Sequence, residues 1–210
     1  WQGKHTNIVS KKFGSWLFLS EIFLSIDLEN DKPSKDNCGS CNDCLTICPT
    51  NALYENSKID ARKCISYLTI EYKGPIPMSL REKIGNKVYG CDDCLSVCPW
   101  NKFSKTTKEK NFLALEKEKD LKFFLDFDEN IFKKYFVQSP ILRIGWIPFI
   151  RNILIASGNS KIQNLRSSVK KYLTHKEPLV RGTAVWSINK LYKFKKTELF
   201  QKLKTMEKNK

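Results

Sequence analysis

The chain has 210 residues, of which 41% are hydrophobic, and a formal net charge of +15. This length and composition suffice for one sizeable domain or two small ones with a packed core. The longest apolar stretches, residues 15–26 and 144–156, are interrupted by polar or proline residues, so membrane-spanning functions are excluded and no membrane partner is expected.

The excess of positive over negative charge is confined to the second half of the chain. Residues 1–100 carry 12 basic and 12 acidic side chains, whereas residues 131–210 carry 18 and 3. A strongly cationic region attracts polyanions, so nucleic acid is the first candidate partner. General lysine richness is the alternative, but it would not have left residues 1–100 neutral.

The first residues, 1–7, read as part of a folded segment, so we expect further sequence upstream. Residues 13–28 are dense in aromatic and apolar side chains, which predicts a strand or buried helix that packs on a larger sheet. The polar residues 30–37, which include Pro33, are interpreted as a linker.

All eight cysteines fall into two groups. The first, C-x2-C-x2-C-x3-C-P, ends at Cys48-Pro49; the second, C-x2-C-x3-C-P, ends at Cys98-Pro99 and has its leading cysteine displaced to Cys64. In the first spacing, three thiolates bind one iron-sulfur cube and the fourth reaches a second cube. By this crossing rule, one 4Fe-4S cluster would be held by Cys38, Cys41, Cys44 and Cys98. The other would be held by Cys48, Cys64, Cys91 and Cys94.

Structural zinc and disulfide bonds are the two alternative uses of these cysteines. Structural zinc also uses C-x2-C pairs, but it rarely takes three cysteines at these spacings followed by C-P. Disulfides are disfavoured because a lysine-rich chain without a signal peptide indicates a reducing, cytoplasmic interior. Iron-sulfur clusters are therefore the favoured interpretation, with zinc as the alternative.

Between and after the cysteines, short elements are expected. Each C-P pair should end a short turn of helix, because the residue before proline disfavours helical backbone. The alternation in residues 66–71 predicts a strand or extended segment. Ser79 is expected to N-cap a short helix that runs to about Ile84. Residues 101–120 are polar and lysine-rich, which predicts a mobile connection.

Beyond this connection, apolar side chains recur at helical spacing in three stretches. These stretches are residues 144–155, 162–172 and 179–191. Gly158-Asn159 and residues 175–177 are expected to be joints, with Pro178 in the first turn of the last helix. The stretch after Pro178 is similar to one helix of a HEAT-type pair.

The sequence therefore predicts an α+β fold. Residues 31–105 would form a ferredoxin-like domain with two 4Fe-4S clusters. Residues 106–210 would form an all-α, HEAT-like basic domain suited to nucleic acid. Residues 1–30 would belong to a third domain that lies mostly upstream.

Taken together, these residues make the chain resemble the epoxyqueuosine reductase family, cobalamin-dependent iron-sulfur enzymes of tRNA modification. The blocks that carry the resemblance are Gly3-Lys-His-Thr-Asn7, Gly14-Ser-Trp16, Cys64-Ile-Ser-Tyr-Leu-Thr-Ile-Glu71, Gly85-Asn86, Tyr89-Gly-Cys-Asp-Asp-Cys94 and Cys98-Pro-Trp-Asn101. Ordinary ferredoxins have none of these blocks around their cysteines.

The resemblance implies an oxidoreductase of queuosine biosynthesis that reduces epoxyqueuosine to queuosine at the tRNA wobble position. Cobalamin would be fed by two 4Fe-4S clusters, and these by a low-potential donor such as flavodoxin or ferredoxin. The proton-donating aspartate would lie upstream, with residues 1–30 as a remnant of the cobalamin-binding catalytic domain. We expect a cytoplasmic monomer that does not turn over as this chain alone.

The resemblance also implies roles for single residues. The residues expected near cobalamin are His5, Ser66 and Asp92. The residues expected to bind tRNA are Lys73, Arg143, Arg151 and Arg181. The alternative for each cation is a solvated surface charge, and the alternative for His5 is a side chain satisfied by local backbone.

Two other functions remain alternatives. A corrinoid reductive dehalogenase shares the cobalamin and cluster chemistry, but the basic helical region and the block from Cys64 to Glu71 argue against it. A ferredoxin-type electron-transfer module would use its cations to dock an acidic protein. Salt-sensitive binding of a tRNA anticodon stem-loop separates this module from the tRNA enzyme.

Overall fold

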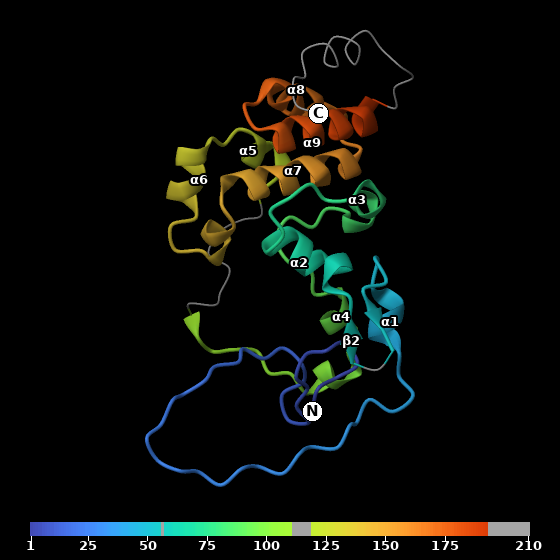
Figure 1. Ribbon diagram of the computed structural model, residues 1–210, viewed down its shortest axis with the longest axis vertical. Helices are drawn as coiled ribbons and strands as arrows, with labels where there is room; N and C mark the ends of the chain where they lie inside the picture. The colour runs from blue at the N-terminus through green and yellow to red at the C-terminus, as the bar shows by residue number, and fades with distance from the viewer. Residues whose placement is uncertain (56, 111–118, 193–210) are drawn as a thin grey trace. The chain divides into compact units, whose positions relative to one another are not determined.

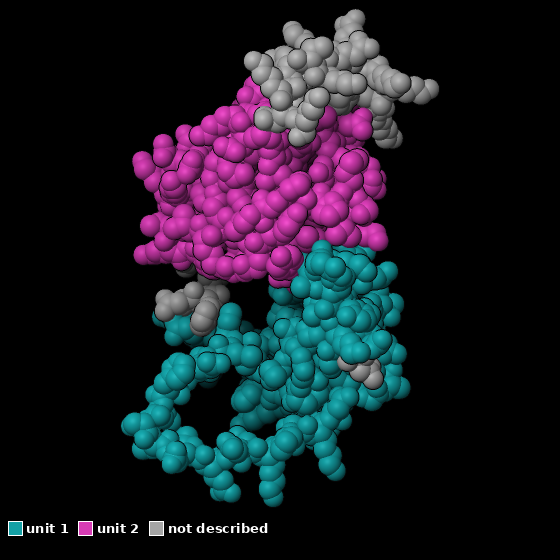
Figure 2. Space-filling model, in the orientation of Figure 1, with its two compact units in different colours: residues 1–64, 92–115 teal, residues 65–91, 116–210 magenta. Residues whose placement is uncertain are grey.

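The computed structural model describes residues 1–55, 57–110 and 119–192. The chain divides into two compact units, drawn in teal and magenta in Figure 2. Unit 1 consists of residues 1–64 and 92–115. Unit 2 consists of residues 65–91 and 116–210.

These units do not follow the three predicted segments. Residues 1–30 belong to the same compact unit as the first cysteine group, and residues 65–91 leave the predicted ferredoxin-like segment for the helical unit. The second difference has a clear physical cause, because buried polar side chains of the helical unit bind the backbone of residues 68–88.

Unit 1 contains little regular structure. Its elements are α1 (Asp43–Ile47), β1 (Leu53–Tyr54), β2 (Lys58–Ile59), η1 (Ala61–Lys63), α4 (Asp93–Ser96) and η2 (Pro99–Phe103) (Figure 1). The strands β1 and β2 pair antiparallel, with Leu53 opposite Ile59. Both α1 and α4 end shortly before a C-P pair, which confirms the predicted helical turns.

Residues 15–37 of unit 1 trace a long loop that forms no helix or strand (Figure 1). Several of its large apolar side chains are exposed; Phe23 is 93% exposed and Ile22 is 80% exposed. The predicted strand or buried helix at residues 13–28 is therefore wrong for this chain. An apolar pattern forms a buried element only where a neighbouring surface covers it.

Unit 2 is helical in the part of the chain that the structure describes. Its elements are α2 (Ile65–Ile70), α3 (Met78–Ile84), α5 (Leu121–Leu125), α6 (Glu129–Tyr135), η4 (Pro140–Ile144), α7 (Trp146–Ser160), η5 (Gln163–Leu165), α8 (Arg166–Lys170), η6 (Lys171–Thr174) and α9 (Pro178–Tyr192). None of the described helices is long and apolar enough to cross a membrane.

Two of the three predicted helical periods form long helices. They are α7 and α9, and α9 begins at Pro178 as expected. The predicted joint at Gly158-Asn159 is wrong, because α7 continues to Ser160 and stops only where Lys161 adopts a left-handed conformation. The middle period is broken into η5, α8 and η6.

The predicted extended segment at residues 66–71 is also wrong, because it forms most of α2. Ile65, Leu68 and Thr69 are its buried residues, and their spacing is that of one helical face. The predicted helix ending at Ile84 is confirmed as α3, although its N-cap is Pro77 and not Ser79. Part of the predicted connection, residues 111–118, lies outside the described residues.

The core of unit 2 is built on α7, which packs side by side with α9 (Figure 1). Ile150, Ile153 and Leu154 are completely buried. A Cβ at Gly158 would lie 2.7 Å from the ring of Trp186 and 3.0 Å from the Cα of Ser187. Glycine at this position therefore lets the two helices approach closely.

Two neighbouring polar side chains of α7 bind the C-terminal part of α2 and the segment that follows it. Arg151 is fully buried, and its guanidinium donates to the carbonyl oxygens of Leu68 (2.8 Å), Tyr72 (2.7 Å) and Gly74 (2.8 Å). Asn152 donates from Nδ2 to the carbonyls of Thr69 and Val88, both at 2.8 Å.

Arg151 is therefore a structural residue. Burial lowers the pKa of Arg151 to about 10, so the side chain stays charged near neutral pH. The predicted contact between Arg151 and tRNA phosphate is wrong, because a fully buried guanidinium that is bound to three carbonyls is not available to a phosphate.

We expect Arg151→Met to destabilise the chain by about 3 kcal/mol, because three carbonyl oxygens lose a charged donor. Urea unfolding followed by circular dichroism measures this loss. The matched control is Arg143→Met, which breaks an exposed ion pair with Glu71 and should destabilise the chain much less than Arg151→Met. Equal losses for the two variants would contradict the assigned role of Arg151.

Candidate metal centre

A cavity of about 300 Å³ lies within unit 1. Its lining residues are Lys4, His5, Cys38, Cys41, Cys44, Cys98, Pro99, Trp100, Lys102 and Phe103. The four cysteines are the set that the crossing rule assigns to one cluster. At about 30 Å³ for each water molecule, the cavity has room for a group far larger than one ion.

The lining of this cavity does not suit a single metal ion. Within residues 1–55, 57–110 and 119–192, no three His, Cys, Asp or Glu side chains converge closely enough to hold one ion. Zinc needs all of its ligands at about 2.0–2.3 Å from one centre. Four cysteines spread around a cavity of this size favour a polynuclear cluster over zinc.

The thiols of the first cysteine group are close enough to influence one another. Cys44, on α1, is 8% exposed. Burial first, and then the negative charges of Cys41 and Cys38, raise the pKa of the Cys44 thiol. Gathered thiolates repel one another unless a cation neutralises them, so this arrangement suits bound iron.

One of the lining residues, Lys4, fixes the backbone that carries these thiols. The Nζ of Lys4 donates to the carbonyl oxygens of Gly39 and Cys41, both at 2.8 Å, and to Oδ1 of Asn42 at 3.0 Å. Lys4 is 7% exposed, so its ammonium group interacts with this loop rather than with solvent. The sequence places Lys4 in the block from Gly3 to Asn7, but no local pattern predicts this role.

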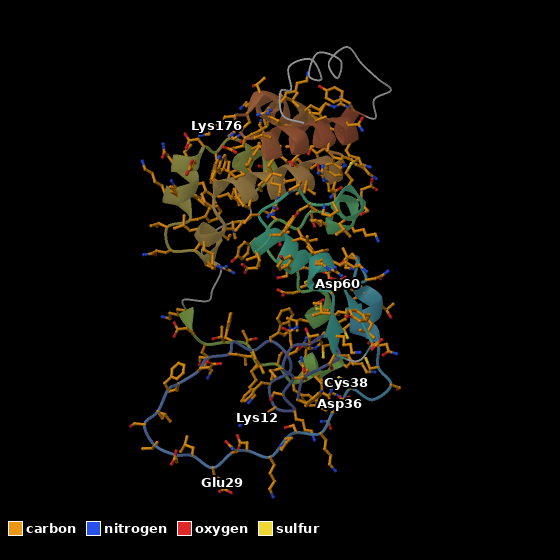
Figure 3. The ribbon with its side chains drawn as sticks, viewed as in Figure 1. Lys12, Glu29, Asp36, Cys38, Asp60 and Lys176 are labelled. Atoms are coloured by element: carbon orange, nitrogen blue, oxygen red, sulfur yellow. The ribbon has the colours of Figure 1, made fainter. Side chains whose placement is uncertain are left out.

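The N-H of Cys38 is held in a similar way by a neighbouring side chain. It donates to Oδ1 of Asp36 at 2.8 Å, and the two residues lie next to each other in Figure 3. This hydrogen bond lowers the pKa of the Asp36 carboxyl. The start of the first cysteine group is thus anchored before its first thiol.

The backbone around Cys98 is anchored to the N-terminal segment. Oδ1 of Asn101 accepts from the N-H (2.9 Å) and the hydroxyl (2.8 Å) of Ser15. Gly14 has a φ of +76°, and a Cβ there would lie 2.9 Å from the same Oδ1, so only glycine fits. Trp100 packs edge-on against Trp1, with ring centroids 4.9 Å apart.

The second cysteine set is divided between the units. Cys48, Cys64 and Cys94 belong to unit 1, and Cys91 belongs to unit 2. Burial opposes ionisation of Cys48, but hydrogen bonds from the N-H of Ala52 and from Thr50 outweigh it and lower the pKa of the thiol. Because its four cysteines belong to different units, this set remains a prediction.

The three residues expected near cobalamin do not form one described site. His5 lines the cysteine cavity, Asp92 is exposed just before α4, and Ser66 is half-buried in α2 of unit 2. His5 is 3% exposed, and burial lowers its pKa, so its ring is neutral.

Among the expected tRNA contacts, Lys73 and Arg143 lie side by side in unit 2. The Nζ of Lys73 donates to the carbonyl of Ile144 at 3.0 Å. Arg143 is 56% exposed and binds Glu71 through Nη2 and Oε1 at 2.6 Å. Arg181 is half-buried and donates to two carbonyl oxygens of residues 175–176.

Comparison with known proteins bears directly on this centre. The sequence pattern of the family described as "4Fe-4S double cluster binding domain" matches residues 37–101. Over 162 residues, the chain is 46% identical to "Epoxyqueuosine reductase" of Vibrio cholerae, which covers 76% of this chain and 44% of the relative. Over 198 residues it is 44% identical to the same enzyme of Francisella cf. novicida, covering 90% and 55%.

The chain is a homologue of epoxyqueuosine reductases. Its fold matches the crystal structure of epoxyqueuosine reductase with a tRNA-Tyr epoxyqueuosine-modified tRNA stem loop. That match has a TM-score of 0.85 and 33% identity, and it covers 100% of this chain and 56% of that chain. This homologue spans about half the length of the epoxyqueuosine reductases it matches.

We expect Lys4→Met to make the centre lose iron faster, because the loop from Gly39 to Asn42 loses three hydrogen bonds to one charged donor. Iron release to a chelator, followed by the loss of visible absorbance, measures this rate. The control is Lys11→Met, which removes an exposed lysine of the same segment. Equal release rates would show that Lys4 does not hold the loop.

Proposed function

We propose that this chain is the cluster-bearing and tRNA-binding part of an enzyme that reduces epoxyqueuosine to queuosine at the tRNA wobble position. The observation that carries this proposal is the cavity of unit 1, where Cys98 joins three cysteines of the first group. The similarity to epoxyqueuosine reductases supports the substrate, although it covers about half of their length.

The proposal assigns two 4Fe-4S clusters to the eight cysteines. Cluster 1 is held by Cys38, Cys41, Cys44 and Cys98. Cluster 2 is held by Cys48, Cys64, Cys91 and Cys94. The shared cavity supports cluster 1, and the spacing of the motifs supports cluster 2.

The residues around cluster 1 have distinct tasks in this proposal. Trp100, Phe103 and Pro99 supply apolar walls that limit the access of water, and such cover helps to set a cluster's reduction potential. Lys4 and Asn101 fix the loops that carry the thiols. A bound cluster would supply electron transfer from a low-potential donor, such as flavodoxin or ferredoxin, and these fixed loops would keep the reorganisation of the site small.

Cobalamin, when bound to the whole enzyme, would supply the reductive chemistry at the epoxide. Ser66 and Asp92 are the residues of this chain that we assign to its surroundings. Because these residues belong to different units and form no single described site, no proton or electron transfer is assigned to them.

The tRNA-binding role is assigned to unit 2, which we propose to be HEAT-like. Lys73 and Arg143 present neighbouring cations, as a phosphate contact requires. The hydrogen bond from Arg143 lowers the pKa of Glu71, so Glu71 is ionised and competes with phosphate for the guanidinium. The ion pair therefore weakens the attraction that Arg143 can offer to RNA.

We expect the chain, assembled with iron and sulfide without oxygen, to hold about eight iron and eight sulfide ions. Double substitutions test which cysteines share a cluster. Cys38→Ala with Cys98→Ala should leave about four iron ions, because both changes strike cluster 1. Cys38→Ala with Cys94→Ala should leave almost none, because each change strikes a different cluster.

Metal analysis and electron paramagnetic resonance (EPR) measure these contents. Almost no iron in the variant with Cys38→Ala and Cys98→Ala, which is expected if each cysteine group binds its own cluster, would overturn the crossed assignment. Stoichiometric zinc in the unsubstituted chain would remove the redox role altogether.

The tRNA role predicts opposite effects for the two partners of one ion pair. Arg143→Gln should weaken binding of an epoxyqueuosine-modified anticodon stem-loop and flatten the plot of log K against log salt by about 0.7–0.9. Glu71→Gln should tighten binding, because Arg143 is released. Fluorescence anisotropy at several salt concentrations measures both effects.

The matched control is the ion pair between Lys133 and Glu129 on α6, whose Nζ and Oε1 lie 2.8 Å apart. Lys133→Gln and Glu129→Gln should change the affinity little. If this pair has the same effects as Arg143 and Glu71, the attraction is a general property of the charged surface and the assigned contact is wrong.

A further inference from the structure

His5 carries a buried hydrogen-bond donor beside the cysteine cavity. We propose that the Nε2-H of His5 donates to a sulfur atom of cluster 1 and raises the reduction potential of that cluster. This inference rests on the proposed function, since it requires that Cys38, Cys41, Cys44 and Cys98 hold a 4Fe-4S cluster.

The hydrogen bonds of His5 determine which ring nitrogen carries the proton. Nδ1 of His5 accepts from the backbone N-H of Asn7 at 3.2 Å. In a neutral imidazole one nitrogen accepts and the other donates. The proton therefore sits on Nε2, which is a donor.

This donor has no partner in the part of the chain that the structure describes. His5 is 3% exposed, and its Nε2 is buried without a hydrogen bond. Buried donors in folded proteins are almost always paired, so an unpaired one calls for an explanation. A sulfur atom of a cluster bound in the cavity supplies that explanation.

The lining of the cavity shows what kind of acceptor fits. Besides cysteine, the lining side chains are Lys4, His5, Pro99, Trp100, Lys102 and Phe103. Lysine and tryptophan only donate hydrogen bonds, and proline and phenylalanine side chains do neither. Cysteine sulfur is therefore the only acceptor among the remaining lining side chains, and a bound cluster would add its inorganic sulfides as further sulfur acceptors.

The backbone near His5 is shaped to hold the ring in place. A Cβ at Gly3 would lie 3.0 Å from Cε1 and 3.2 Å from Nε2 of His5, so the ring lies against a position without a side chain. Thr6 has a φ of +70°, which is strained for a β-branched residue. The turn is closed by the hydrogen bonds Gly3 N to Asn7 O and Thr6 N to Gly3 O, both 2.9 Å.

A donor that points at cluster sulfur has a definite electrostatic effect. Reduction adds one negative charge to the cluster, and a hydrogen bond to sulfur stabilises the more negative state. With the donor, cluster 1 accepts an electron at a higher potential. His5 is thus a positioning and tuning residue, and with four cysteines present the cluster needs no histidine ligand.

The first test is a redox titration of the iron-reconstituted chain, followed by EPR. His5→Leu removes the donor, whereas His5→Gln keeps an N-H at a similar reach. At the midpoint of the unsubstituted cluster 1, His5→Leu should lower the ratio of reduced to oxidised cluster about tenfold, equivalent to ~59 mV for one electron. His5→Gln should shift this ratio less than His5→Leu.

The chain offers a matched control, because its only other histidine is His175. Nδ1 of His175 accepts from the N-H of Glu177 at 3.1 Å, and the residue belongs to unit 2. His175→Leu should leave both cluster potentials unchanged. A shift as large as that of His5→Leu would overturn the inference.

A second readout needs no change at His5. With ¹⁵N-histidine, only two rings are labelled, so pulsed EPR of the reduced chain should show a weak ¹⁵N coupling and a proton coupling that disappears in D₂O. The His175→Leu variant should keep both couplings. This measurement decides the question even if His5→Leu does not retain iron.

The outcomes separate the inference from the proposed function. A chain that binds no iron-sulfur cluster would remove both. Clusters with unchanged potentials in His5→Leu and no histidine coupling would overturn the role of His5 alone. A strong ¹⁵N coupling, typical of nitrogen bound to iron, would also overturn it, in favour of His5 as a ligand.

Discussion

The mutual repulsion of closely gathered thiolates is the constraint on which the centre of this protein depends. Burial and the neighbouring charges of Cys38 and Cys41 raise the pKa of Cys44, so the cavity resists holding several bare thiolates. Hydrogen bonds offset part of that resistance by holding the backbone that carries the thiols. Lys4 donates to the carbonyl of Gly39 near the first cysteine group, and Asn101 accepts from Ser15 near Cys98. The cationic iron-sulfide core of a bound cluster would remove the repulsion itself, and Lys4 and Asn101 would then hold the geometry of the site.

In unit 2, polar side chains also fix a segment of backbone through hydrogen bonds to its carbonyl oxygens. Arg151 and Asn152 are buried polar side chains, and together they bind five carbonyl oxygens between residues 68 and 88. This segment carries Lys73 and leads to Cys91. One helix, α7, thereby positions a candidate tRNA contact and supports the backbone before a proposed cluster ligand.

Much of the local structure was predictable where one strong rule acts alone. The C-P pairs predicted the ends of α1 and α4, and helical periodicity predicted α7 and α9. Spacing also predicted that Cys98 belongs with the first cysteine group, and the shared cavity supports that proposal.

The failures have a common physical origin in tertiary contacts. Residues 66–71 alternate like a strand, yet most of them form a helix. Leu68 and Thr69 are buried within unit 2, and their carbonyl oxygens accept hydrogen bonds from side chains of α7. Arg151 reads as a surface cation in the sequence, since nothing local shows that it will be buried. Lys4 and the donor of His5 were missed as parts of the cysteine cavity because their partners lie far along the chain or outside it.

Because Cys44 and Cys98 line the same cavity, a cluster bound there as proposed would cross-link the chain. A cube bound to both would close the long loop between them. Because it would limit the conformations of the unfolded chain, as a disulfide does, it would raise the free energy of unfolding by roughly 4 kcal/mol. Destruction of the cube by oxygen would then also remove this cross-link from unit 1. The redox group and the rigidity of its own binding site would be lost together.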